Sequence, residues 1–246
     1  MIQHRFRWMA SVLPVCMTGC AERLPTYPWI DEAHAMKLMT ERAAGIKTLS
    51  SPCRIVLTDP KRGPTQLEGA IAARTTGFLR LRAWKFSQPV LDITLTPEGL
   101  WLYIAEDNDE SRGPRSPFAD LTAQRLRQGW SFATGSILLD GWTWSIPNSN
   151  RSVELERESD SGGLIRCEVD RPSLTLRRCT MTEPSDAAPW TLTLDRYRTF
   201  DELLVPTYLV LGSVHGTITV ILDDPSLNDE IPPSAFDPPR RAIKQP

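Results

Sequence analysis

Segments in which apolar and polar residues alternate recur along most of this chain. Leu79, Leu81 and Ala83, for example, are separated by Arg80 and Arg82. The same period of two occurs at residues 90–96, 100–104, 153–156, 174–177, 190–195 and 217–222. Because successive side chains of a strand point to opposite faces, this period predicts strands with one buried and one solvated face. The sequence therefore predicts an antiparallel sheet of about nine to eleven strands.

Two regions follow a helical period instead. Asp31 is a favourable N-cap, and the apolar residues after it recur at steps of three and four up to Ile46. We expect one long amphipathic helix here, which ends before Ser50-Ser51-Pro52. The region 106–150 opens with an acidic, loop-like stretch and continues with loosely helical spacing, so we expect an insert made of a loop and short helices.

The predicted fold class is α+β, mainly antiparallel β: a curved, incomplete β-barrel covered by the long N-terminal helix and by short lid helices. One apolar stripe is too narrow to cover so wide a sheet, so either residues 117–146 complete the cover or apolar side chains face a hollow. The alternative is an ordinary filled core. The candidate cavity-lining residues are Met36, Met39, Leu79, Leu81, Leu91, Ile93, Leu100, Leu102, Leu192, Leu194, Ile218 and Val220.

The start of the chain resembles the signal of a bacterial lipoprotein. Arg5 and Arg7 precede a short apolar run, and Met17-Thr18-Gly19-Cys20 resembles a lipobox, whose cysteine becomes the lipidated N-terminus. The alternatives are a secretory signal cut elsewhere and a start without a targeting role. The lipobox interpretation divides the chain into a signal peptide (1–19), lipidated Cys20 with a tether (20–30), a single domain (31–239) and a tail that frays (240–246).

The charges give no support to nucleic-acid binding. The chain has 28 Lys and Arg residues against 30 Asp and Glu residues, and they are mixed along its length. Removal of Arg5 and Arg7 with the signal peptide changes the formal charge from −2 to −4. Because no basic stripe exists to neutralise phosphates, we expect no nucleic-acid partner.

Three cysteines remain after the signal peptide and the anchor are set aside. Cys167 and Cys179 flank a predicted turn at residues 170–173, and Cys53 lies apart. A two-residue hairpin at this turn would place Cys167 opposite Leu176, so a disulfide requires a longer loop or a bulge. The alternative is three buried thiols that pack as small apolar groups.

The sequence offers no set of residues that indicates catalysis. His34 and His215 are isolated, and the acidic residues 106–110 lack the ligand spacing and the glycine of a calcium loop. No phosphate-binding glycine loop or nucleophile elbow is present. We therefore expect no metal, no cofactor and no enzyme activity.

Several segments resemble the LolA/LolB superfamily of lipoprotein carriers. They are Leu67-Glu68-Gly69-Ala70, Gly77 to Arg82, Thr96 to Tyr103 and Ile231 to Pro239, and the resemblance spans most of residues 30–239. It implies a half-barrel whose apolar interior shelters acyl chains of lipoprotein or lipid cargo, with a periplasmic carrier protein as a further partner. It also implies a lipid anchor in the outer membrane and a domain that faces the periplasm, because Ala21, not aspartate, follows Cys20.

The resemblance implies roles for two more residues. Arg74 matches an arginine that holds the lid by hydrogen bonds in the soluble carrier; a solvated arginine at a strand end is the alternative. Phe86 lies in the hairpin that corresponds to a membrane-contacting loop of the anchored receptor; a buried core phenylalanine is the alternative. The tryptophan-rich insert departs from the family pattern, so a scaffold lipoprotein that binds another envelope protein remains a second functional hypothesis, and a hydrolase a third.

Overall fold

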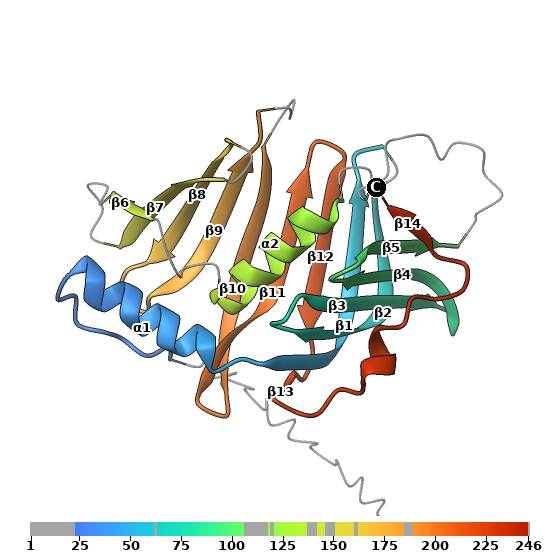
Figure 1. The fold of residues 1–246 in the computed structure, drawn as a ribbon, viewed down its shortest axis with the longest axis horizontal. Coiled ribbons are helices and arrows are strands. Elements are labelled where there is room, and N and C mark those ends of the chain that lie inside the picture. The colour runs from blue at the N-terminus through green and yellow to red at the C-terminus, as the bar shows by residue number, and fades with distance from the viewer. Residues whose placement is uncertain are drawn as a thin grey trace, which may run out of the picture.

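One antiparallel sheet with two α-helices on one of its faces makes up the fold of this chain (Figure 1). The computed structural model describes residues 23–61, 63–105, 118, 121–136, 142–145, 151–159, 162–184 and 189–245. The predicted signal peptide and Cys20 lie outside these residues. Within them, no helix is both long and apolar enough to cross a membrane.

Most of the described elements are strands. The helices are α1 (Glu32–Ala44), α2 (Ala123–Thr134) and a short 3-10 helix, η2 (Pro233–Phe236). The strands are β1 (Thr48–Asp59), β2 (Gly63–Arg74), β3 (Phe78–Lys85), β4 (Gln88–Thr96), β5 (Gly99–Ile104), β6 (Thr143–Ser145), β7 (Ser152–Glu158), β8 (Leu164–Asp170), β9 (Thr175–Thr182), β10 (Trp190–Phe200), β11 (Leu203–Ser213), β12 (Gly216–Leu222), β13 (Ser226–Leu227) and β14 (Ile243–Gln245).

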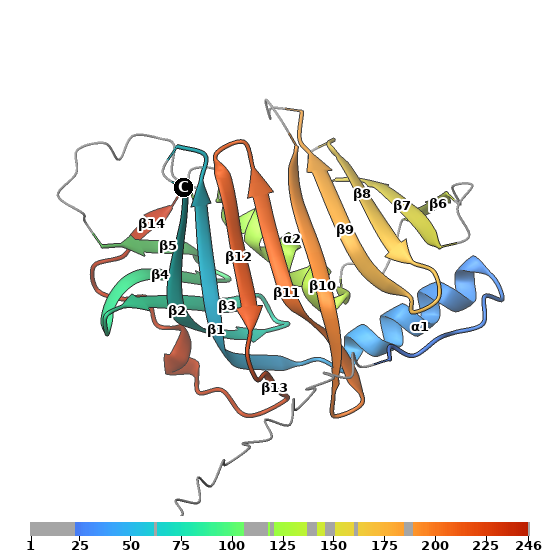
Figure 2. The same ribbon diagram turned by 180° about the vertical axis from the view of Figure 1, so that it is seen from behind.

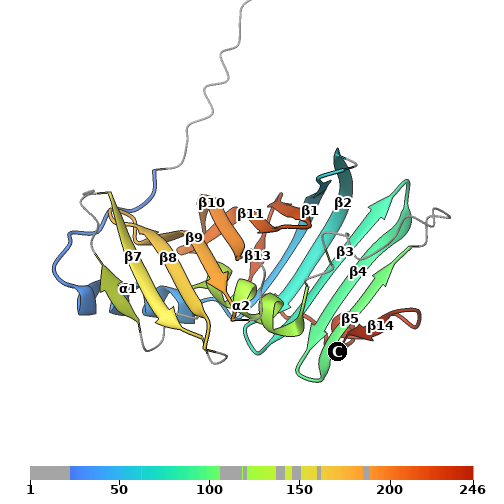
Figure 3. The ribbon, with the colours of Figure 1, turned by 90° about the horizontal axis from the view of Figure 1, so that it is seen from above.

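The sheet is open. Its strands follow the order β14-β5-β4-β3-β2-β1-β12-β11-β10-β9-β8-β7-β6, and β13 pairs with β1. The two ends of this order lie far apart, and the sheet curves between them (Figure 3). The described sheet has 14 strands, more than the expected nine to eleven. The additional strands β6, β13 and β14 have two or three residues each, too few for an alternating pattern to be visible.

The predicted alternation separates a buried from a solvated face in β3 but not in β4, where Asp92, Thr94 and Thr96, expected on the solvated face, are buried as well. The C-terminal segment packs against this face, where Arg80 binds the Ala235 carbonyl. In β3, Leu79, Leu81 and Ala83 are buried, whereas the intervening Arg82 is exposed. The buried positions face the helices. Seen from behind, the opposite face of the central strands carries no α-helix (Figure 2).

The N-terminal helix is shorter than expected. α1 has 13 residues and ends at Ala44, with Gly45 as its C-cap. The residues expected to end it, Ser50-Ser51-Pro52, are part of β1, where Pro52 pairs with Ala70 of β2. On its other side β1 pairs first with β13 through Ser50 and then with β12 from Cys53, so Pro52 falls where the partner changes.

The two helices cover different parts of the sheet. α1 packs over β7–β10, with Ala35 and Met39 against buried side chains such as Leu155 and Ile165. α2 lies over the centre, where Trp130 joins the cluster of β1–β5 and β12. We call these regions the α1 half (α1 with β7–β10) and the α2 half (α2 with β1–β5, β11 and β12).

Both ends of the described chain are tied to the sheet. The predicted tether is packed where it is described: the Tyr27 amide donates to Pro172 O (2.8 Å), and the Trp29 ring lies 5.8 Å from that of Trp144. The tail, expected to fray, forms edge strand β14, in which Ile243 pairs with Leu102 of β5.

An apolar hollow beneath α2

An apolar hollow lies between α2 and the concave face of the α2 half. From the strands, its walls are Ile71, Leu79, Leu81, Ile93, Leu192, Leu209, Leu211, Ile218 and Val220. Leu121, Arg125, Leu126, Gly129, Trp130 and Ala133 of α2 and the residues before it form its cover. The alternating pattern explains why the walls are apolar, because all the strand residues come from the same face of the sheet.

Gly129 explains why the cover does not fill the hollow. It lies in the middle of α2, and a Cβ atom added to it would meet nothing within 4 Å. Glycine destabilises the interior of a helix by roughly 1 kcal/mol relative to alanine. Space is therefore left beneath α2 at a position where almost any other residue would favour the helix more.

The free volume of the hollow is small. Its free space is about 90 Å³, whereas pockets that hold drug-sized ligands span roughly 300–1,000 Å³. Few polar bonds to the sheet hold the cover in place. Arg127 Nη2 donates to the Thr96 and Pro97 carbonyl oxygens at the β4–β5 turn (2.9 and 3.4 Å). A larger guest therefore needs more space than the hollow offers in this structure.

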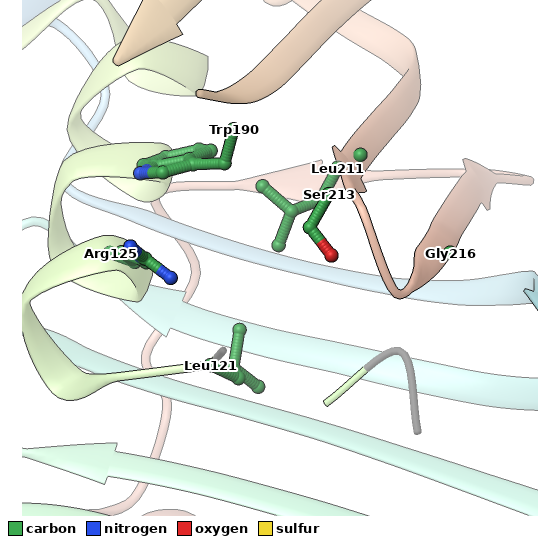
Figure 4. Close-up of a pocket in the computed structure, with 7 residues that line it drawn as sticks. Leu121, Arg125, Trp190, Leu211, Ser213 and Gly216 are labelled. Carbon is green, nitrogen blue, oxygen red and sulfur yellow. The ribbon is translucent and has the colours of Figure 1, made fainter. Parts of the chain in front are cut away.

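One end of the hollow adjoins a smaller pocket with a polar edge. Arg125 and Leu121 border it on the side of α2, Trp190 on β10, and Ser213 and Gly216 at the turn between β11 and β12 (Figure 4). Leu121, Arg125 and Leu211 line both spaces. The hollow thus leads toward the edge of the sheet where β11 turns into β12.

The strand register places several turns along this same edge. Thr58 pairs with Thr217, which puts the β1–β2 turn beside the start of β12. Glu68 pairs with Trp84, which puts the β3–β4 turn next along the edge. We call this edge, formed by the β1–β2, β3–β4 and β11–β12 turns, the mouth rim. The β8–β9 turn, which contacts Tyr27, lies at the opposite rim, beyond the pairing of Asp170 with Thr175.

The tryptophans near the hollow carry buried donors. The Trp130 side chain is 8 % exposed, and its Nε1 has no hydrogen-bond partner among the described residues. Trp190 is 3 % exposed, and its Nε1 also has no hydrogen-bond partner among the described residues. A buried donor without an acceptor is unfavourable, so both indoles are polar exceptions in apolar surroundings.

The candidate cavity-lining residues fall into two groups. Leu79, Leu81, Ile93, Leu192, Ile218 and Val220 line the hollow. The others do not: Met36, Met39 and Leu194 belong to the α1 half, while Leu91, Leu100 and Leu102 pack elsewhere in the α2 half. Alternation assigned the face correctly, but it did not indicate where along the sheet the space would be. Residues 117–146 were offered as one possible cover, but the individual residues that line the hollow from α2, Gly129 above all, were not named, although an isolated glycine within a helical pattern is a recognised signal of packing or function.

Arg74 lies away from α2. Its Nη2 donates to the Ile231 carbonyl, and its guanidinium lies 5.4 Å from the centre of the Phe236 ring. Nearby, Arg80 binds both Asp92 (2.8 Å) and the Ala235 carbonyl (2.9 Å). These arginines hold the C-terminal segment against the sheet. The predicted hydrogen bond from Arg74 to a lid helix is not among the bonds of the described residues.

Phe86 occupies the tip of the β3–β4 hairpin on the mouth rim. Its side chain is 92 % exposed, so it is not a core residue. Phe86 and Ser87 have positive φ values of 52° and 63°, which is the conformation of a tight two-residue hairpin turn. Val214, at the tip of the β11–β12 turn on the same rim, is 58 % exposed.

No polar cluster of the described residues suggests a metal. In these parts of the chain no three His, Cys, Asp or Glu side chains gather as metal ligands would. Residues 106–110, the acidic cluster considered in the sequence, lie outside the described part of the chain.

The architecture matches solved structures of very different sequence. A candidate outer membrane lipoprotein-sorting protein domain from Vibrio parahaemolyticus superposes with a TM-score of 0.56 at 11 % identity, over 83 % of this chain and 95 % of that one. The fold is LolA/LolB-like. A LolA superfamily protein from Nitrosomonas europaea gives a TM-score of 0.52 at 10 % identity, over 82 % of this chain and 97 % of the other.

A third structure with this LolA/LolB-like fold is a DUF1329 family protein from Desulfovibrio piger, with a TM-score of 0.57 at 10 % identity over 83 % of this chain and 96 % of the other. No protein-family model matches the sequence, and no curated protein matches it either. At such low identities the likeness establishes the fold, while the function has to be argued from the hollow.

Proposed function

We propose that this protein is a lipid-anchored envelope lipoprotein that binds the acyl chains of lipoproteins or lipids beneath α2 and helps to transfer or insert them at the outer membrane. The observation that carries this proposal is the apolar hollow with Gly129 in its cover. It needs no catalytic residue, in keeping with a carrier and not an enzyme. The sorting domain and the LolA superfamily protein that share the fold are consistent with such a role.

Apolar burial supplies the free energy of binding. Each methylene moved from water into an apolar site contributes about 0.8 kcal/mol, so ten of them contribute roughly 8 kcal/mol. Part of this free energy is spent on displacing α2, because the hollow is too small for a whole chain. In this scheme α2 is the lid, and Arg127 is the residue whose bonds to Thr96 and Pro97 break when it lifts.

Delivery to a membrane would take place at the mouth rim. The polar-edged pocket opens there, and the exposed Phe86 and Val214 are apolar side chains at hairpin tips. Lys85 Nζ lies 5.9 Å from the centre of the Phe86 ring, so a cation accompanies the apolar tip. Such a pair suits the boundary between lipid headgroups and acyl chains. Anchoring through Cys20 would keep the domain near the bilayer.

The substitution Gly129→Leu tests the proposal directly. A Cβ atom at this position meets nothing within 4 Å, so a leucine side chain would start in free space next to the hollow, and it would improve the helix. We expect the affinity for a fluorescent sixteen-carbon fatty acid to fall at least tenfold. A loss of this size corresponds to a few methylene contacts that the acyl chain no longer makes. The melting temperature should not fall.

Gly129→Ala is the matched control, because it removes the glycine while filling only one methyl volume. It should retain most of the binding. Mass spectrometry of the purified wild-type protein should also detect bound acyl chains. Unchanged affinity of Gly129→Leu, together with no bound acyl chain in the wild type, would contradict an acyl-binding function.

The second hypothesis, a scaffold that binds another protein through the tryptophan-rich insert, has no specific observation in its favour among the described residues of that insert. Trp144 packs on Trp29, and the Arg157 guanidinium lies 5.1 Å from the centre of the Trp142 ring. Trp130 belongs to α2 and is buried on the side of the helix that faces the sheet. All three tryptophans are thus engaged within the chain itself.

A further inference from the structure

Cys167 and Cys179 lie directly opposite each other on neighbouring strands. They are Cα partners in the antiparallel pair β8–β9, and their sulfur atoms are 2.6 Å apart. Opposite residues of an antiparallel pair have Cα atoms about 4.5–5.5 Å apart, which is within the range of about 4.4–6.8 Å that a disulfide spans. The pairing therefore places the two cysteines at a backbone separation that a disulfide can span.

The hairpin achieves this register by two departures from a simple turn. Residues 171–174 form a four-residue connection between Asp170 and Thr175. One step further along, the register shifts at Glu168 and Val169, where β9 holds an extra residue. The longer loop and the bulge together move the partner of Cys167 from Leu176, expected for a two-residue turn, to Cys179.

We propose that Cys167 and Cys179 form a disulfide in the native protein. This rests on the proposed envelope location, because disulfides persist in oxidising compartments and are rare where thiols are kept reduced. In the structure both residues are thiols, as is Cys53, which lies in the other half of the molecule. Cys53 is therefore left as the unpaired thiol of the domain.

The bond forms by thiol–disulfide exchange with an oxidised dithiol protein. The thiolate of one cysteine attacks the oxidant's disulfide, which gives a mixed disulfide and releases one oxidant thiolate. The second cysteine loses its proton and attacks the mixed disulfide, which forms the Cys167–Cys179 bond and releases the other oxidant thiol. The protein loses two electrons and two protons, and the oxidant's disulfide gains them.

Burial of the two sulfur atoms determines the stage of folding at which this exchange can take place. Cys167 is 0 % and Cys179 is 1 % exposed, so an oxidant cannot reach either sulfur in the folded domain. Burial also raises the pKa of the Cys179 thiol, with a further contribution from its contact with Cys167, so little attacking thiolate is present after folding. The bond therefore forms before the hairpin is covered by α1, and it resists reduction afterwards.

Peptide mapping tests the proposal in the full-length protein expressed with its own signal. Cells are quenched in acid, free thiols are alkylated, and the protein is digested with trypsin without reduction. Cleavage after Arg166, Arg177, Arg178 and Arg196 gives peptides 167–177 and 179–196, because Pro172 blocks cleavage after Arg171. We expect these two peptides joined at the mass of a disulfide, and peptide 48–54 with Cys53 alkylated. Alkylated Cys167 and Cys179 would overturn the proposal.

A second measurement separates geometry from location. Reduced, purified protein is unfolded and refolded in a mixture of reduced and oxidised glutathione, and the same peptides are mapped. We expect the 167–177 and 179–196 cross-link, in Cys53→Ala as in the wild type. Failure here overturns the proposal because the geometry is wrong. Success here with alkylated thiols from cells overturns it because the compartment is reducing, which would also count against the proposed envelope location.

The double variant Cys167→Ala, Cys179→Ala isolates the effect of the bond. It should melt roughly 5–10 °C below the oxidised wild type, as expected for a bond that closes a loop of this length. Its affinity for the fluorescent fatty acid should be unchanged, because the pair lies in the α1 half. The difference in melting temperature between the wild type and the double variant should disappear in reductant. A difference that is the same with and without reductant would argue against a bond in the wild type.

Discussion

The α1 half and the α2 half use the same sheet, the same alternation and one covering helix each, yet they are packed to different degrees. Beneath the end of α1 the free space is about 30 Å³, which is room for about one water molecule. Beneath α2 it is about 90 Å³ and apolar. The helices differ at these places, since α1 presents Met39 to the sheet, whereas α2 presents Gly129.

The two helices are also fastened differently. Arg42 of α1 is half-buried, and its guanidinium donates to the carbonyl oxygens of Ser173 and Leu174. Burial lowers the pKa of Arg42, which is the mark of a cation held away from water. Arg127 of α2 binds the β4–β5 turn, through a part-buried bond to Thr96 O and an exposed one to Pro97 O. The two helices thus differ in where their arginines bind.

The largest contrast is expected from truncation of a leucine in each half. Leu155, in the α1 half, is 0 % exposed, and Leu155→Ala should cost about 2–5 kcal/mol of unfolding free energy. Leu211 lines the hollow, so it has fewer neighbours to lose, and Leu211→Ala should cost less than half as much. Denaturant unfolding measures both. Equal losses would mean that the hollow is filled in solution.

Enlargement of a small residue should have opposite effects in the two halves. Ala35 of α1 is 3 % exposed, so Ala35→Leu should overpack the α1 half and cost about 1–3 kcal/mol. Gly129→Leu should be neutral or stabilising by up to about 1 kcal/mol. Thermal unfolding of the two variants side by side decides the point, and destabilisation by Gly129→Leu would show that the space beneath α2 is not available.

Removal of the Arg127 side chain should loosen α2 alone. Arg127→Ala loses the bond to the Thr96 carbonyl, which is worth about 1 kcal/mol and therefore raises local opening several-fold. Hydrogen exchange should accelerate in α2 and stay unchanged in α1. Gln124→Ala, an exposed position on the same helix, serves as the control. Faster exchange in both helices would indicate that they open as one unit.

A smaller effect is expected at alkaline pH, where both halves lose stability. Burial raises the pKa of Cys53 to about 12, with a smaller contribution from Asp223, and burial likewise raises the pKa of Tyr197 in the α1 half. These groups ionise more readily once unfolded, so their contribution is complete below pH of about 9 and falls as pH rises toward their folded pKa values.

Unfolding measured between pH 7 and pH 11 should show this decline. Tyr197→Phe removes the hydroxyl that donates to Leu176 O, so it should remove the contribution of the α1 half to the decline in unfolding free energy with pH. Cys53→Ala should remove the contribution of the α2 half. A stability that does not change with pH up to 11 would mean that neither group is buried in solution.

Much of the fold was predictable because it depends on local pattern. The apolar residues of β3 and β4 and the Pro97-Glu98 turn follow from a few neighbouring residues. The edge strands β6 and β14 were not predictable, since three residues carry no period. The length of α1 was overestimated because the pairing of Thr48 with Arg74, 26 positions later, decides that β1 begins there.

The candidate site was predictable only in part. The sequence indicated apolar side chains on one face, but it left a filled core and a hollow as alternatives. The outcome depends on which helix residue meets which part of the sheet, as with Gly129, and on long-range contacts such as that of Arg74 with Ile231. The opposition of Cys167 and Cys179 depends on one bulge in β9, which no local pattern marks.

The contact between Tyr27 and Pro172 determines which way an anchored domain would face. With residues 23–30 docked on the β8–β9 turn, the mouth rim is about one strand length away, roughly 40 Å for the 12 residues of β1. A domain held in this way would point Phe86 and the hollow away from its own bilayer, toward incoming cargo. Undocked, the 11 residues from Cys20 to Ile30 would reach roughly 36 Å, a little less than this distance, so the domain could tilt its mouth rim toward the bilayer. Loading and delivery of cargo would then take place in two orientations of the same tethered domain. The aromatic residues of the tether would set the equilibrium between the two orientations.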